Sequence, residues 1–204
     1  MNLPNRLTLA RFVMALGFVA LMSFHHYYTY LAAYVVFTAA AITDFYDGKI
    51  ARARGQITSF GKLLDPVADK VLVIGALIML KDIPYLWIPG WTVVVIIARE
   101  FMITGARSLA ASDGLILGAN WWGKTKTVTQ LVYVFVFLLL AMVAHVWERY
   151  EEVATPPDHS LALFRQIVRH ASLWAIVLVA AVTIYSGAQF LCVNWRAIQG
   201  GERS

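Results

Sequence analysis

Four aspartates stand in a short polar stretch between two apolar segments of the chain. The stretch runs from Asp44 to Asp69 and also holds three glycines and four basic residues. Ionisable groups at the edge of a membrane span are costly to place, so they usually mark a functional site. Asp44 and Asp47 are three residues apart, and Asp65 and Asp69 are four apart. Each pair can therefore share one face of a helix.

Two helices that present such faces to each other would gather four carboxylates in a small volume. Like charges this close either neutralise by protonation or recruit cations. Oxygen-only ligands suit hard divalent ions, Mg²⁺ first and Mn²⁺ or Ca²⁺ next. The alternative is two ordinary helix ends with acidic N-caps and solvated lysines, which explains one aspartate well but all four poorly. The pattern therefore predicts a divalent-metal site.

The composition indicates a membrane protein. Of 204 residues, 60% are hydrophobic and 14% are charged, whereas soluble domains are about 45–50% apolar and about 25% charged. This length predicts one domain over residues 1–204. The net charge of +5 is concentrated between apolar segments, which favours an anionic membrane surface and phosphate-bearing substrates over nucleic acid. Cys192 is the only cysteine, which excludes an intramolecular disulfide.

A helix needs about 20 apolar residues to cross a bilayer, and six apolar segments, five of them of roughly this length and one shorter, alternate with polar connections. The sequence therefore predicts an all-α, polytopic integral membrane protein with six transmembrane helices. The segments are Leu7–Phe24, Tyr30–Thr43, Leu63–Leu80, Leu86–Leu109, Val128–Trp147 and Ala171–Val193.

The connections between these segments predict the topology. We expect a polar loop between Asp44 and Leu63, a polar connection over 112–126, a mixed-charge connection over 148–170 and a polar tail from Asn194. The first two of these connections and the tail carry lysine and arginine, whereas the basic residues of the 148–170 connection are mixed with acidic ones. Because cytoplasmic loops carry an excess of lysine and arginine, both termini and the aspartates are predicted to face the cytoplasm.

The spacing Asp44-x2-Asp47-Gly48-x2-Ala51-Arg52-x8-Gly61-x3-Asp65-x3-Asp69 resembles the complete signature of the CDP-alcohol phosphotransferases. Members of that family are integral-membrane enzymes that break the pyrophosphate of a CDP-linked donor. Those that use CDP-diacylglycerol transfer its phosphatidyl group to an alcohol and release CMP. The resemblance implies the same class of reaction for this chain.

The resemblance also implies roles for individual residues. Asp44, Asp47 and Asp65 would bind the first of two divalent cations, Mg²⁺ or Mn²⁺, and Asp44, Asp65 and Asp69 would surround the second. Asp69 would also be the general base for the attacking hydroxyl. The positions expected to line the CDP-lipid site are Asn5, Thr8, Gly48, Arg52, Thr58 and Gly61.

Two further segments, 99–107 and 123–127, resemble the branch of bacterial phosphatidylglycerophosphate synthases, whose acceptor is sn-glycerol 3-phosphate. A phosphate-bearing acceptor needs cations. Positive-inside anchoring could account for one of the lysines, but the arginines stand inside an apolar stretch, where Glu100 is expected to pair with one of them. The run Tyr185-Ser186-Gly187 also resembles the last helix of that branch, although small residues at a helix contact explain it equally well. The predicted ligands of the acceptor phosphate are Arg99, Arg107, Lys124 and Lys126.

The resemblance thus implies an enzyme of the bacterial plasma membrane that converts CDP-diacylglycerol and glycerol 3-phosphate to phosphatidylglycerol phosphate and CMP. Dimers are common in the family, so a homodimer is among the expectations. Cardiolipin synthase, or an enzyme with another acceptor, is the alternative within the family. A divalent-cation transporter is the alternative outside it, but a transporter has no need for Gly48, Arg52 and Gly61 at set intervals between its carboxylates.

Overall fold

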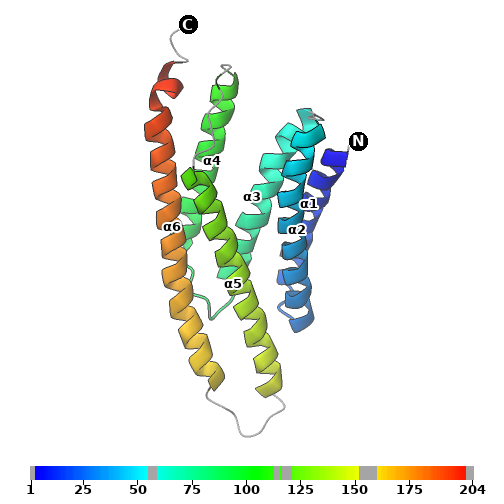
Figure 1. Ribbon diagram of the computed structural model, residues 1–204. Helices are drawn as coiled ribbons and strands as arrows, with labels where there is room; N and C mark the ends of the chain where they lie inside the picture. Colours follow the sequence, from blue (N-terminus) through cyan, green and yellow to red (C-terminus); the bar gives the residue numbers. More distant parts are fainter. Residues whose placement is uncertain (1–2, 55–58, 113–114, 116–120, 152–159, 201–204) are drawn as a thin grey trace. The chain divides into compact units, whose positions relative to one another are not determined.

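The computed structural model describes residues 3–54, 59–112, 115, 121–151 and 160–200, and the side chains of 8–43, 67–68, 70–112, 115, 121–150 and 160–195. These parts of the chain are helical and contain no strand. The all-α prediction is therefore confirmed. The helices are α1 (Leu3–Met22), α2 (Tyr27–Arg54), α3 (Ser59–Lys81), α4 (Gly90–Ser112), α5 (Trp121–Glu151) and α6 (Ser160–Gly200), as Figure 1 shows.

Among the residues whose side chains are described, two helices are long and apolar enough, by length and composition, to cross a membrane. They are the α5 segment Trp121–Tyr150 and the α6 segment Ser160–Trp195. Shorter apolar stretches cover Thr8–Met22 of α1 and Tyr27–Thr43 of α2. The six transmembrane helices expected from the sequence therefore stay a prediction. The 41 residues of α6 extend over about 60 Å, roughly twice the thickness of the hydrocarbon core.

Several helices extend past the apolar segments that predicted them. The expected loop after Asp44 is helical as far as Arg54, because α2 continues through it. Helix α5 begins at Trp121, so Lys124 and Lys126 lie on a helix and not in a connection. Helix α6 likewise includes part of the expected 148–170 connection and of the tail. The predicted boundaries were wrong because they followed hydrophobicity, whereas Lys, Arg, Ala and Gln continue a helix well into polar surroundings.

The chain forms two compact units. Unit 1 comprises Met1–Trp87 and Val134–Ser172, and unit 2 comprises Ile88–Tyr133 and Leu173–Ser204. Unit 1 thus contains α1, α2 and α3 with one part of α5 and of α6, and unit 2 contains α4 with the remaining parts.

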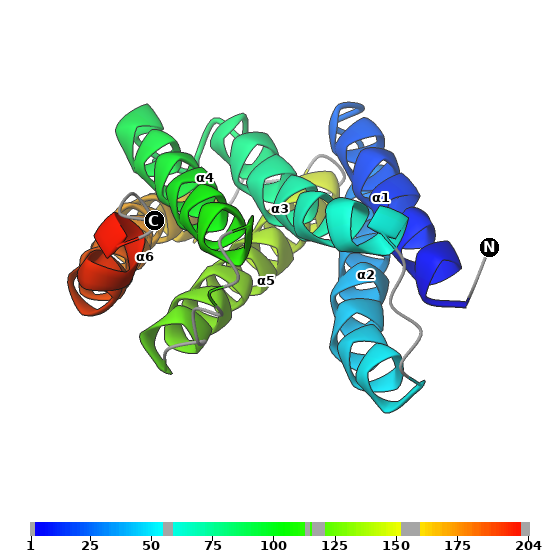
Figure 2. The same cartoon turned by 90° about the horizontal axis from the view of Figure 1, so that it is seen from above.

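In unit 1, α1 packs against both α2 and α3, as Figure 2 shows from above. Small side chains line these contacts: Ala15, Ala33 and Ala76 are fully buried. A Cβ added to Gly75 of α3 would lie 3.0 Å from Cγ2 of Val19 in α1. Small residues allow helix backbones to approach closely, which is the usual way in which helices pack in membranes.

The polar ends of α2 and α3 lie at the same end of this three-helix group (Figure 1). Helix α1 leads through a short turn into α2, so the two helices are antiparallel, and α3 runs back beside α1. The apolar part of α2 is held by Phe37, whose ring is 5.5 Å from that of Phe18 and 5.0 Å from that of Phe135 in α5. This packing holds the apolar part of α2 in place, and the polar end of the helix extends beyond it.

Candidate functional site

The four aspartates lie on the two helices that the spacing predicted. Asp44 and Asp47 are in α2, and Asp65 and Asp69 are in the first turns of α3. Both helices belong to unit 1. Residues three or four apart in a helix lie on one face, so each pair shares a face as expected. The aspartate side chains fall outside the described part of the structure, and the metal site therefore stays a prediction.

Five of the six positions expected to line the CDP-lipid site lie on α1, α2 and α3. Gly48 and Arg52 are in α2, and Gly61 is in α3, one turn before Asp65. Thr8 of α1 is buried. Asn5 is also in α1, whereas Thr58 lies outside the described residues.

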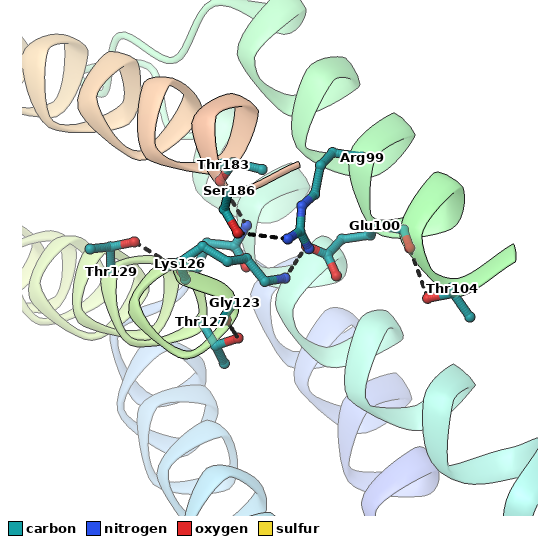
Figure 3. Close-up of polar contacts among 10 residues, drawn as sticks. Arg99, Glu100, Thr104, Gly123, Lys126, Thr127, Thr129, Thr183 and Ser186 are labelled. Carbon is teal, nitrogen blue, oxygen red and sulfur yellow. Dashed lines mark hydrogen bonds and ion pairs between the residues drawn. The ribbon is translucent and has the colours of Figure 1, made fainter. Parts of the chain in front are cut away.

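A second polar cluster, in unit 2, joins three helices. Arg99 and Glu100 come from α4, Lys126 from α5 and Ser186 from α6 (Figure 3). Arg99 Nη2 donates to Ser186 Oγ at 2.8 Å, and Arg99 Nη1 lies 3.4 Å from Glu100 Oε1. Lys126 Nζ donates to the same carboxylate oxygen. We call these four residues the Arg99 cluster. They confirm that Glu100 pairs with an arginine, and they add Lys126 as its second partner.

The Arg99 cluster carries an excess of positive charge in a buried place. The side chains of Arg99, Lys126 and Glu100 are 8%, 9% and 14% exposed. One carboxylate thus stands between two cations. Buried charges are costly unless they are paired and hydrogen-bonded. An anion bound beside Arg99 would add a partner for its guanidinium group.

Arg99 also has donor capacity that the described residues do not use. Its Nε is buried without a hydrogen-bond partner there, and its contact with Glu100 is long for a charge-assisted bond, which is typically about 2.7–2.9 Å. An unsatisfied buried donor costs about 1–3 kcal/mol. The arrangement therefore favours a ligand rich in acceptor oxygens, such as a phosphate.

The other two predicted acceptor ligands are not members of the Arg99 cluster. Arg107 lies two turns further along α4, with its guanidinium carbon 5.1 Å from the centre of the Phe190 ring in α6. Lys124 is exposed on α5. The structure thus brings two of the four predicted cations together, Arg99 and Lys126. Sequence reasoning did not assign Ser186 to this cluster, although the resemblance of the Tyr185-Ser186-Gly187 run was a signal for it.

A third group of polar contacts lies in unit 1, at the opposite end of α1, α2 and α3 from the aspartates. His25 stands in the turn between α1 and α2 and contacts two other side chains. His25 Nδ1 is 3.3 Å from the Tyr30 hydroxyl, and His25 Nε2 is 3.6 Å from Asp82. Tyr85 donates to the carbonyl of Ala141, and burial raises the pKa of the Tyr85 phenol. These contacts tie the connections to the helices and bring together no catalytic set.

Comparison with known proteins identifies the family. A model of the CDP-alcohol phosphatidyltransferase family matches residues 1–157, which include the aspartates and three of the four members of the Arg99 cluster. The chain belongs to this family.

Two curated relatives of this CDP-alcohol phosphatidyltransferase match nearly its whole length, and a third matches about two thirds of it. It is 35% identical, over 97% of both chains, to the CDP-diacylglycerol–glycerol-3-phosphate 3-phosphatidyltransferase of Bacillus subtilis. It is 31% identical, over 96% of both chains, to the protein of the same name from Yersinia enterocolitica. A probable phosphatidylglycerophosphate synthase of Mycobacterium tuberculosis is 40% identical over 68% of this chain and 66% of its own.

Proposed function

We propose that this CDP-alcohol phosphatidyltransferase transfers the phosphatidyl group of CDP-diacylglycerol to sn-glycerol 3-phosphate and releases CMP. The observation that carries the proposal is the 35% identity over 97% of both chains to a relative with that name. The buried positive charge of the Arg99 cluster supports it, because an acceptor that bears a phosphate needs such a site, whereas an uncharged alcohol does not.

The acceptor phosphate would be bound by cations of unit 2. Arg99 offers its unused Nε, and Lys126 can share its ammonium group between Glu100 and an incoming anion. Arg107 and Lys124 are the other two proposed ligands. Arginine suits this role because its planar donors match two phosphate oxygens at once.

Two divalent cations, Mg²⁺ or Mn²⁺, fit the donor set of α2 and α3. Four carboxylates on two helices of one unit offer only oxygen, which is the ligand that these hard ions prefer. Asp44, Asp47 and Asp65 would hold the first ion, and Asp44, Asp65 and Asp69 the second. When bound, such ions neutralise diphosphate charge and stabilise the leaving oxygen of CMP.

In the transfer itself, the primary hydroxyl oxygen of glycerol 3-phosphate forms a bond to the phosphorus that carries diacylglycerol. The bond from that phosphorus to the CMP oxygen breaks, and the hydroxyl proton passes to Asp69. A carboxylate among cations has a low pKa and is a weak base, so the orientation of the two substrates must supply most of the rate. The donor would be held by Asn5, Thr8, Gly48, Arg52, Thr58 and Gly61.

We also propose a bacterial plasma-membrane location with both termini and the aspartates in the cytoplasm. The support is the concentration of lysine and arginine near the polar end of α2, the start of α5 and the tail. A homodimer belongs to the same proposal.

The test is a CMP-release assay on purified protein with CDP-diacylglycerol and a panel of acceptors. We expect release with glycerol 3-phosphate and none with phosphatidylglycerol, serine or inositol phosphate. Release with phosphatidylglycerol alone would make the protein a cardiolipin synthase. No release with any acceptor, together with uptake of Mg²⁺ or Mn²⁺ into proteoliposomes, would favour the transporter.

A further inference from the structure

One face of α6 contacts polar side chains from both neighbouring helices of unit 2. Thr183, Ser186, Gly187 and Phe190 follow each other at intervals of three, one and three residues, so they lie on one face of the helix. We call these four residues the α6 stripe. Thr183 Oγ1 accepts a bond from Gln130 Nε2 of α5 at 3.3 Å. The other three residues contact arginines of α4.

The contact at Gly187 requires the absence of a side chain. A Cβ at this position would lie 3.0 Å from Arg99 Cγ and 3.5 Å from Arg99 Nε. The first distance is tighter than most real Cβ contacts, so the Arg99 side chain would have to give way by a few tenths of an ångström. The second is an ordinary contact distance, which places Gly187 beside the donor that has no partner among the described residues. Ser186, one residue earlier, accepts the bond from Arg99 Nη2 at 2.8 Å.

The stripe contacts both of these arginines of α4. Arg99 and Arg107 are eight residues apart on α4, or about 12 Å along the helix. Their contact residues on α6, Ser186 and Phe190, are only four residues apart, or about 6 Å. A phosphate can accept bonds of about 2.8 Å on opposite sides, so two arginines that contact neighbouring turns of α6 are candidates to bind one phosphate.

We propose that Ser186, Gly187 and Phe190 are positioning residues that aim Arg99 and Arg107 at the phosphate of the acceptor. The inference rests on the proposed function, because it assumes that these arginines bind glycerol 3-phosphate. Ser186 keeps Nη2 occupied and away from Glu100, Gly187 leaves Nε open, and Phe190 supports Arg107 through its ring face. None of the three contacts the substrate itself.

The experiment measures steady-state kinetics of the full-length enzyme with each substrate varied in turn. Ser186→Ala and Gly187→Ala should each raise the KM for glycerol 3-phosphate by about 3- to 10-fold and leave the KM for CDP-diacylglycerol unchanged. This is less than the 10- to 100-fold rise that loss of a charged contact causes, as expected for Arg99→Gln. In an Arg99→Gln background, Ser186→Ala should have no further effect, because it acts only through Arg99.

Two variants serve as matched controls. Gly105→Ala adds the same methyl group on α4, where a Cβ meets nothing within 4 Å. Thr183→Val removes a hydroxyl from the same face of α6, but the bond it breaks is to Gln130 and not to an arginine. Both controls should leave the acceptor KM unchanged. Since Ala favours a helix over Gly by about 1 kcal/mol, a raised KM in Gly187→Ala cannot be ascribed to a weaker helix.

The outcomes separate the two proposals. If Arg99→Gln raises the acceptor KM but Ser186→Ala and Gly187→Ala do not, the positioning inference is wrong and the acceptor site stands. If the effects of Ser186→Ala and Arg99→Gln are fully additive in the double variant, Ser186 acts elsewhere and the inference is again wrong. If Arg99→Gln leaves the acceptor KM unchanged, the proposed acceptor site itself is overturned.

Discussion

Glu100→Gln should destabilise the protein strongly, because Glu100 is the carboxylate that two buried cations share. Its removal leaves Arg99 and Lys126, each at least nine-tenths buried, as neighbouring like charges. Removing one partner of a buried ion pair costs about 3–5 kcal/mol. Glu100 is itself 14% exposed, so we take the lower end, about 3 kcal/mol. For a chain of this length, that corresponds to a fall in Tm of about 6–12 °C.

The assay is thermal unfolding of detergent-solubilised protein with and without glycerol 3-phosphate. The phosphate of glycerol 3-phosphate brings a negative charge to the place from which Glu100→Gln removed one. The ligand should therefore raise the Tm of Glu100→Gln more than that of the wild type. The matched control is Glu148→Gln. Glu148 pairs with Arg165 at 2.8 Å, but its side chain is 44% exposed, so its loss should cost under about 1 kcal/mol.

Two results would refute this reasoning. The first is a Glu100→Gln variant that is no less stable than the Glu148→Gln variant. The second is an equal rise in the Tm of Glu100→Gln and of the wild type when glycerol 3-phosphate is added. The double variant Glu100→Gln/Lys126→Gln gives a further check. It should recover part of the lost stability, because the repulsion between the neighbouring charges of Arg99 and Lys126 is then removed.

Three further predictions concern the proposed chemistry. Chelation by EDTA should abolish CMP release and Mg²⁺ or Mn²⁺ should restore it, since carboxylates cannot otherwise hold a diphosphate; full activity in excess EDTA would contradict the metal proposal. Asp44→Asn and Asp69→Asn should each abolish turnover while the protein still purifies, and a loss of only a few-fold in Asp69→Asn would rule out the general base. Arg107→Gln should raise the KM for glycerol 3-phosphate about 10- to 100-fold, and Arg52→Gln should raise the KM for CDP-diacylglycerol instead. If either variant changed both KM values equally, the proposed division between acceptor and donor ligands would be wrong.

The positions of the aspartates could be predicted because helical periodicity and the family signature describe the same local spacing. Asp44 and Asp47, like Asp65 and Asp69, depend only on the helix that carries them. Helix ends were harder to predict. Lys124 and Lys126 were placed in a connection because apolar residues are sparse there, yet helix propensity continues through them.

The Arg99 cluster shows what local patterns do not contain. The pairing of Glu100 with one of the two arginines was expected, but its pairing with Lys126 joins residues 26 apart in the sequence. The bond from Arg99 to Ser186 spans 87 residues. Such contacts depend on which faces of α4, α5 and α6 meet, and hydrophobicity in a single sequence does not define these faces. Gly187 illustrates this, since a glycine in an apolar helix gives no sign of which side chain fills the space it leaves.

The distance in sequence between Arg99 and Ser186 also matters while the chain is being made. At about 5–20 residues per second, the ribosome needs roughly 4–17 s to add the residues that separate them. During this interval α4 carries a guanidinium group whose partner on α6 has not been synthesised. The adjacent carboxylate of Glu100 is already present and can pair with Arg99 from the start. Glu100 would then act first as the companion of Arg99 during membrane insertion, and only later, once α5 and α6 have been added, as a member of the finished cluster.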